Sequence, residues 1–431
     1  MLRREFLALA AASALRAMPT PKIRDVSVIT CAPAGVRLVV VKVTTDQDGL
    51  YGYGCATFTQ RADLVVEAVT RYLKPFLIGK TTDRIDDLWQ AMHASSYWRN
   101  GPVLNNAISG VDEALWDIKG RQAGMPVYQL LGGKCREAAM VYGHAAGGEI
   151  SETIDQAKQL IARGFKVVRL QVGIEGMAAY GASALKNNQS GTSLYQGSVF
   201  EPGPYTRKTL KLFEQGRKEL GDEIGLLHDV HERLPPRMAV QFAKDMEQFR
   251  LFFLEDPLAP EDIGYFREIR SQCATPLAMG ELFNNPQEWS PLIKDQLIDY
   301  IRIHVSQAGG LTPCRKIAAM AEMCQVQTAW HGPPDTSPVG HCANVTLDVV
   351  AYNFGIQEWS PMNERVREVF DGCPEMKDGY MYPNDKPGWG VEVNEKAAAK
   401  YPFGYGESEE RKRLNGGWGE VRRQDGTVIK Q

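Results

Sequence analysis

Three acidic residues stand at equal intervals along the chain, each at the end of a short apolar run. Asp229, Glu255 and Glu281 close the segments GLLHD, LFFLE and PLAMGE, and each lies 26 residues after the one before. That interval is about the length of a strand, a helix and the return strand. Since the carboxyl ends of parallel strands meet at one edge of a sheet or barrel, the three carboxylates are expected to converge. Oxygen ligands without cysteine or histidine suit a hard cation, Mg²⁺ before Ca²⁺ or Mn²⁺.

A simpler interpretation is that each acid caps the helix that follows it, because Asp and Glu are favoured at helix N-termini. This explains one acid well. It explains less well three acids that share one period and all end apolar strands.

Composition narrows the classes of function. The chain has 431 residues, of which 44% are hydrophobic, and a net charge of −3. Such a charge leaves no basic stripe, so we do not expect nucleic acid as a partner. No apolar run reaches the ~20 residues of a membrane span, so none is expected. Residues 1–20 pair Arg3 and Arg4 with an apolar stretch. They predict a twin-arginine-like export signal and a periplasmic location, the alternatives being an N-terminal helix or a misassigned start.

The order of predicted strands and helices divides the rest of the chain into three segments. Residues 21–137 place strands before helices, which predicts an α+β domain. Residues 138–360 alternate strands and helices, and a (β/α)₈-type barrel is the leading interpretation, with a doubly wound open sheet as the alternative. Residues 361–431 are rich in turns and are expected to pack on the first domain. The expected barrel strands are 140–143, 166–172, 224–230, 251–254, 277–279, 300–305, 326–330 and 354–357.

The expected strand ends carry more polar residues than packing requires: His144, Arg169, Gln171, Asp229, His231, Glu255, Glu281, His331 and Glu358. A Mg²⁺ ion held by the three acids would stabilise charge that develops beside a substrate carboxylate. His231 lies two residues after Asp229, so on a strand both would point to the same side, and His231 is a candidate acid. Arg169 cannot act as a base, but it would lower the pKa of a nearby phenol, and Tyr180 follows in the next loop.

These residues sit in longer segments that resemble the enolase superfamily, and within it the mannonate dehydratase group, which includes starvation-sensing and D-gluconate dehydratase-like members. The similar segments cover nearly everything after Pro21. They are LWDIKG (115–120), YQLLGG (128–133), VYGHA (141–145), LEDP (254–257), LIDYIR (297–302), AGG (308–310) and NFGIQE (353–358).

The resemblance implies a (β/α)₇β barrel under an α+β capping domain, and Mg²⁺ bound by Asp229, Glu255 and Glu281. It implies syn-dehydration of a sugar acid, of the D-mannonate or D-gluconate class, to a 2-keto-3-deoxy acid through an enediolate. Arg169 and Tyr180 match the base pair, and His231 matches the acid. The substrate-contacting positions implied are His144, His331, Glu358, Trp98, Asp335 and Thr59, the last standing where this group has asparagine. A symmetric homo-oligomer is also implied.

Two other functions remain open from the sequence. A racemase or epimerase of the same superfamily would pair its histidine with an aspartate one strand earlier, and the segment YIRIHV (300–305) has none. A sugar-acid binding or sensing protein with little turnover would keep the metal site. It would have no need of the acid and base.

Overall fold

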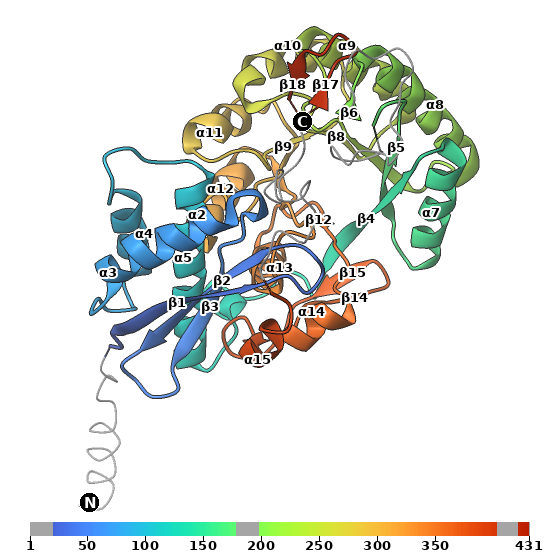
Figure 1. Ribbon diagram of the computed structural model, residues 1–431. Helices are drawn as coiled ribbons and strands as arrows, with labels where there is room; N and C mark the ends of the chain where they lie inside the picture. The colour runs from blue at the N-terminus through green and yellow to red at the C-terminus, as the bar shows by residue number, and fades with distance from the viewer. Residues whose placement is uncertain (1–19, 178–197, 403–420, 431) are drawn as a thin grey trace, which may run out of the picture.

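The computed structural model describes residues 20–177, 198–402 and 421–430 (Figure 1). The N-terminal domain begins with an antiparallel sheet in the order β1-β2-β3, which precedes the helices of the domain as the sequence predicted. Its strands are β1 (Ile23–Cys31), β2 (Leu38–Thr45) and β3 (Tyr51–Cys55). Its helical elements are α2 (Ala62–Glu67), η2 (Ala68–Leu73), α3 (Lys74–Leu77), α4 (Ile85–His93), α5 (Pro102–Ala123) and α6 (Val127–Leu130).

Helix α5 lies directly on β3, and two glycines allow the close approach. A Cβ at Gly52 would lie 2.2 Å from the carbonyl oxygen of Ala114, and one at Gly54 would lie 2.1 Å from that of Gly110. Any side chain on this face of β3 would therefore push the helix away. The helix is buried along most of its length, between this sheet and the barrel.

The second domain is a closed parallel barrel. Strand β12 pairs with β4, and Phe354, just before β12, bridges Thr328 in β11, so the sheet returns to its first strand. This closure excludes the open-sheet alternative. The barrel strands are β4 (Ala139–Gly147), β5 (Val167–Val172), β7 (Gly225–Asp229), β8 (Phe253–Glu255), β9 (Leu277–Met279), β10 (Tyr300–Ile301), β11 (Gln327–Thr328) and β12 (Gln357–Glu358).

Each of the first seven barrel strands is followed by a helix, as a (β/α)₇β barrel requires. These helices form the outer ring in Figure 1. They are α7 (Ile150–Ala162), α8 (Pro202–Leu220), α9 (Pro236–Met246), α10 (Phe266–Gln272), α11 (Pro286–Lys294), α12 (Leu311–Met323) and α13 (Pro338–Val350). No helix of the described residues is long and apolar enough to cross a membrane.

The C-terminal segment contacts both domains. Its elements are α14 (Glu364–Val369), β13 (Phe370–Asp371), β14 (Glu375–Lys377), β15 (Tyr380–Tyr382), β16 (Glu392–Val393), α15 (Glu395–Ala398), β17 (Val421–Arg422) and β18 (Val428–Ile429). Trp389 donates from its backbone nitrogen to Asp117 of α5 at 2.9 Å, which ties the segment to the capping domain. Strand β15 pairs with the start of β4, and β17 pairs with β6 (Ser198–Val199) beside the barrel. The last described residues thus contact the barrel, where the sequence pointed to the first domain.

Candidate active site

The polar residues at the strand ends converge because of the strand period. A layer of buried side chains fills the barrel, and it consists of Tyr142, Val167, Leu227, Phe253, Ala278, Ala329 and Ile356, with Tyr300 packed against it. Successive side chains of a strand alternate in direction, so the residue two positions later again points inward. Two positions after these residues stand His144, Arg169, Asp229, Glu255, Gly280, His331, Glu358 and Arg302. The site is therefore the next layer of the barrel interior.

Arg302 lies at the centre of this layer and is fully buried. Its guanidinium is 3.0 Å from Glu255 Oε1, 2.9 Å from Glu281 Oε2 and 2.5 Å from Glu358 Oε2. It also donates to the Tyr142 hydroxyl at 2.9 Å. Sequence reasoning missed this residue, although it occupies the same strand position as the residues that were predicted.

Arg169 supplies a second buried cation. Its Nη1 lies 3.3 Å from Asp229 Oδ2 and 3.4 Å from Glu255 Oε1. Its Nη2 lies 3.2 Å from Nδ1 of His144. Since a guanidinium only donates, His144 Nδ1 accepts and the ring proton is on Nε2, which faces Glu358 Oε1 at 3.0 Å. Burial and Arg169 lower the pKa of His144, consistent with this neutral form.

Two of the three predicted acids, Asp229 and Glu255, lie in an acidic cluster, and its third member is Asp256 where the sequence predicted Glu281. Oxygens of Asp229, Glu255 and Asp256 all lie within 4.8 Å of one another, and all three side chains are buried. Glu281 is directed toward Arg302 instead, and its Oε2 is 3.2 Å from His331 Nε2. Asp256, which was not predicted, accepts from the Gly280 backbone nitrogen at 3.3 Å through Oδ1, while its Oδ2 has no hydrogen-bond partner in the described part of the chain.

The charges in this cluster are not balanced by the arginines alone. Burial raises the pKa of Glu255 and Glu281 well above the ordinary value, and it does the same for Asp256 next to Glu255. Burial acts in the same sense on Asp229, but His231 and the arginines hold its pKa below the usual value. A cluster of buried carboxylate oxygens, one of them without a partner, fits a hard divalent cation.

His231 lies near the cluster for a different reason from the one predicted. β7 ends at Asp229, and His231 has a φ of +56°, so it is not on the strand and does not share its alternation. Its backbone nitrogen donates to Asp229 Oδ1 at 2.8 Å, and this turn directs Nε2 to within 3.6 Å of Glu281 Oε1. The proximity was predicted correctly, but the argument from a shared strand face was wrong.

Three residues that the sequence assigned to loops, Asp335, Thr59 and Trp98, do not belong to this layer of the barrel interior. Asp335 follows β11 and is half-buried, and burial raises its pKa to about 6. Thr59 begins a short 3₁₀ turn and its carbonyl accepts from Arg37 at 2.7 Å. Trp98 is 84% exposed, with its ring edge against Tyr97, so the described chain does not fold it over the barrel. Tyr180 lies outside the described residues.

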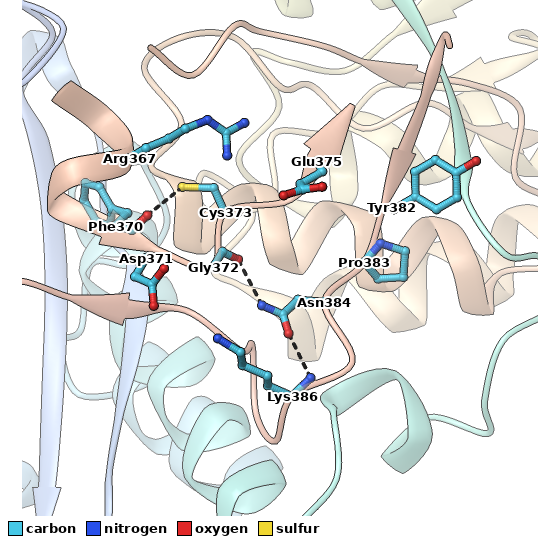
Figure 2. Close-up of a pocket in the computed structure, with 10 residues that line it drawn as sticks. All are labelled: Arg367, Phe370, Asp371, Gly372, Cys373, Glu375, Tyr382, Pro383, Asn384 and Lys386. Atoms are coloured by element: carbon cyan, nitrogen blue, oxygen red, sulfur yellow. Dashed lines mark hydrogen bonds between the residues drawn. The ribbon is translucent and has the colours of Figure 1, made fainter. Parts of the chain in front are cut away.

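A pocket elsewhere on the chain contains none of the predicted site residues. Figure 2 shows a pocket in the C-terminal segment, lined by Arg367, Phe370, Asp371, Gly372, Cys373, Glu375, Tyr382, Pro383, Asn384 and Lys386. The Asn384 amide donates to Gly372 at 3.1 Å and accepts from the Lys386 backbone at 2.8 Å. The polar groups of the Asn384 side chain are thus used to stabilise the loop around the pocket.

Both domains match known families. Residues 12–132 match the mandelate racemase / muconate lactonizing enzyme N-terminal domain, and residues 152–397 match the enolase C-terminal domain-like family. The chain belongs to the enolase superfamily. A D-galactonate dehydratase family member of Musicola paradisiaca is 52% identical over 392 residues, covering 88% of this chain and 94% of that protein. RspA of Pantoea ananatis, a member of the same family, is 49% identical and covers 94% of this chain and 98% of its own length.

A solved structure agrees with these relatives. An enolase from Pantoea ananatis with bound D-gluconate and Mg superposes with a TM-score of 0.88 at 47% identity, covering 95% of this chain and all of that one. The predicted superfamily, fold and class of enzyme, a sugar-acid dehydratase, are confirmed. The relatives' names refer to D-galactonate, where the resemblance implied the mannonate group, so the substrate of this chain stays a prediction.

Proposed function

We propose that this enolase-superfamily protein is a Mg²⁺-dependent dehydratase of six-carbon sugar acids, with D-gluconate or D-mannonate as substrate. The observation that carries the proposal is the meeting of buried carboxylates with Arg169 on one side and His231 on the other. The bound D-gluconate and Mg of the Pantoea ananatis neighbour support it. The two acids differ only at C2, which becomes the keto carbon, so both give the same 2-keto-3-deoxy acid.

Asp229 and Glu255 would hold the ion, with Glu281 as the third ligand. When bound, the ion would supply a Lewis acid that stabilises negative charge on the substrate carboxylate. To bind the ion, Glu281 would give up its contact with Arg302, while Asp256 would stay bonded to the Gly280 backbone.

The chain's own residues carry the protons. Tyr180, assigned from the sequence, takes the C2 proton, and the positive charge of Arg169 favours its phenolate form. His231 donates a proton to the 3-hydroxyl, which leaves as water while the C3–O bond breaks. The resulting enol takes a proton at C3 and loses the proton of its C2 hydroxyl, which gives the 2-keto acid. His144, with its proton on Nε2, and His331 act as hydrogen-bond donors to the substrate in this scheme.

The alternative is a binding or sensing protein that uses the same pocket without turnover. Tyr180→Phe separates the two, because the variant keeps the ring and loses the proton acceptor. A dehydratase loses at least about 10²-fold in kcat and still binds the acid, measured by product formation and calorimetry. Equal rates in the variant and the unmodified protein would contradict the proposed base. Binding without turnover by the unmodified protein would favour the sensor.

A further inference from the structure

A histidine pair stands next to the proposed metal site, and one of its members, His304, has no role in the scheme above. His304 follows β10 and His331 follows β11, and their Nδ1 atoms lie 2.7 Å apart. The rings meet at 61°, with centroids 4.8 Å apart. The barrel backbone fixes this contact, since the His331 backbone nitrogen donates to the Ile303 carbonyl at 3.0 Å.

Two Nδ1 atoms at this distance share one proton, so one ring donates and the other accepts. His304 is only 2% exposed, and burial lowers its pKa to about 4, so it is neutral. Its Nε2 is buried and has no hydrogen-bond partner among the residues that the structure describes. A lone pair can remain there at less cost than an N–H, because buried donors without acceptors are the rarer case in proteins.

The surroundings of His331 favour the same choice. Its Nε2 lies 3.2 Å from Glu281 Oε2 and 3.7 Å from Glu358 Oε2. In spite of burial, Arg302 holds the pKa of Glu358 well below its usual value, so Glu358 is a carboxylate. A nitrogen facing this carboxylate is stabilised by carrying a proton and is repelled when it presents a lone pair. If His331 has its proton on Nε2, its Nδ1 must accept, and His304 must be the donor.

We infer that His304 is a positioning residue that holds His331 in the Nε2–H form and so makes it a hydrogen-bond donor toward the substrate. This inference rests on the proposed function. A carboxylate in the place of His304 would accept a hydrogen bond from the Nδ1–H of His331 and leave its Nε2 as a base, which is the arrangement that proton abstraction by this histidine requires. The imidazole partner therefore favours dehydration over racemisation at this site.

The test compares His304→Asn with His304→Asp. The two side chains have nearly the same size, but the Asn side chain can donate to His331 Nδ1 through Nδ2, whereas the Asp carboxylate can only accept from it. Nitrogen NMR of protein labelled at histidine reads the ring tautomer, and His331→Gln identifies the His331 signals among those of seven histidines. We expect His331 to carry its proton on Nε2 in the unmodified protein and in the Asn variant, and on Nδ1 in the Asp variant.

Kinetics give the second readout. The Asn variant should keep kcat within about threefold, and the Asp variant should lose about 10²-fold in kcat, in line with the loss of one preorganised donor. A proton on Nδ1 of His331 in the unmodified protein overturns the inference, as do Asn and Asp variants with equal tautomers and rates. The NMR result does not depend on turnover, so failure of the proposed dehydratase activity leaves this test intact. If the Asp variant does not fold, the unmodified protein and the Asn variant still decide the tautomer.

Discussion

Asp112 of the capping helix α5 accepts a hydrogen bond from the backbone nitrogen of Thr312, in the first turn of the barrel helix α12, at 2.9 Å. The residue before that helix is Gly310, which has no side chain to cap it, and a Cβ there would lie 2.6 Å from Asp112 Oδ2. One domain therefore caps a helix of the other. This contact fixes the capping domain over the carboxyl ends of the strands.

Asp112→Ala should lower the free energy of unfolding by about 1–2 kcal/mol, the usual cost of losing an N-cap. Denaturant unfolding measures it. Asp86→Ala is the matched control, because Asp86 also joins α4 to α12, through Arg315 and Lys316, but lies half-exposed. Its loss should cost less than about 1 kcal/mol. A larger effect from Asp86→Ala than from Asp112→Ala would contradict the role of Asp112 as the cap of α12.

Two buried acids of helix α5 should make the stability of the protein depend on pH. Burial raises the pKa of Asp112 from 3.8 to about 7 and that of Glu113 from 4.5 to about 8. The folded chain binds these protons more tightly than the unfolded chain does. The contribution of the two acids to the free energy of unfolding is therefore greatest below pH 4 and is lost as the pH rises toward 8. Asp112→Asn cannot titrate. Between pH 5 and pH 8 its free energy of unfolding should fall by about 2–3 kcal/mol less than that of the unmodified protein. Parallel pH profiles would show that Asp112 is already ionised in the fold.

Removing one acid at a time identifies the third metal ligand. Asp229→Asn and Glu281→Gln should each weaken Mg²⁺ binding at least about 10²-fold in calorimetry, because each removes a charged oxygen donor. Asp256→Asn should have a smaller effect, since Asp256 is bonded to the Gly280 backbone. If Asp256→Asn abolishes binding and Glu281→Gln does not, Asp256 takes the place that the sequence assigned to Glu281.

Arg302 offers a test of the charge balance. Arg302→Met leaves Glu255, Glu281 and Glu358 without their shared cation. Without Mg²⁺ the variant should be about 3–5 kcal/mol less stable, as expected when one partner of a buried ion pair is removed. Added Mg²⁺ should restore more stability to the variant than to the unmodified protein, because the ion replaces part of the lost charge. Thermal unfolding with and without MgCl₂ checks this, and an equal gain in both proteins would contradict it.

Much of this site could be predicted because strands impose a period of two. Val167 and Arg169 share one face of β5, and Leu227 and Asp229 share one face of β7, so apolar runs that end in charge locate the layer. Arg302 obeys the same rule and was missed because its strand was searched for an acid. The left-handed backbone of His231 and the partners of Asp256 depend on loop geometry that no local pattern encodes.

In the capping domain, contacts between residues far apart in the sequence could not be predicted from local patterns. The order of strands before helices in this domain was predicted, but the Asp112–Thr312 contact joins residues 200 positions apart. Trp98 was assigned to the substrate by resemblance and lies exposed in the described chain. A contact supplied by tertiary packing leaves no periodic signal in the sequence.

The most direct test of the account is whether the metal-loaded protein forms a 2-keto-3-deoxy acid. Purified protein with MgCl₂ is incubated with D-gluconate, D-mannonate, D-galactonate and a panel of pentonates and uronates, and the keto acid is measured. The account predicts product from D-gluconate or D-mannonate, abolished by EDTA, restored by Mg²⁺ and absent with Asp229→Asn. Folded protein that binds Mg²⁺ but forms no keto acid from any member of the panel would contradict it.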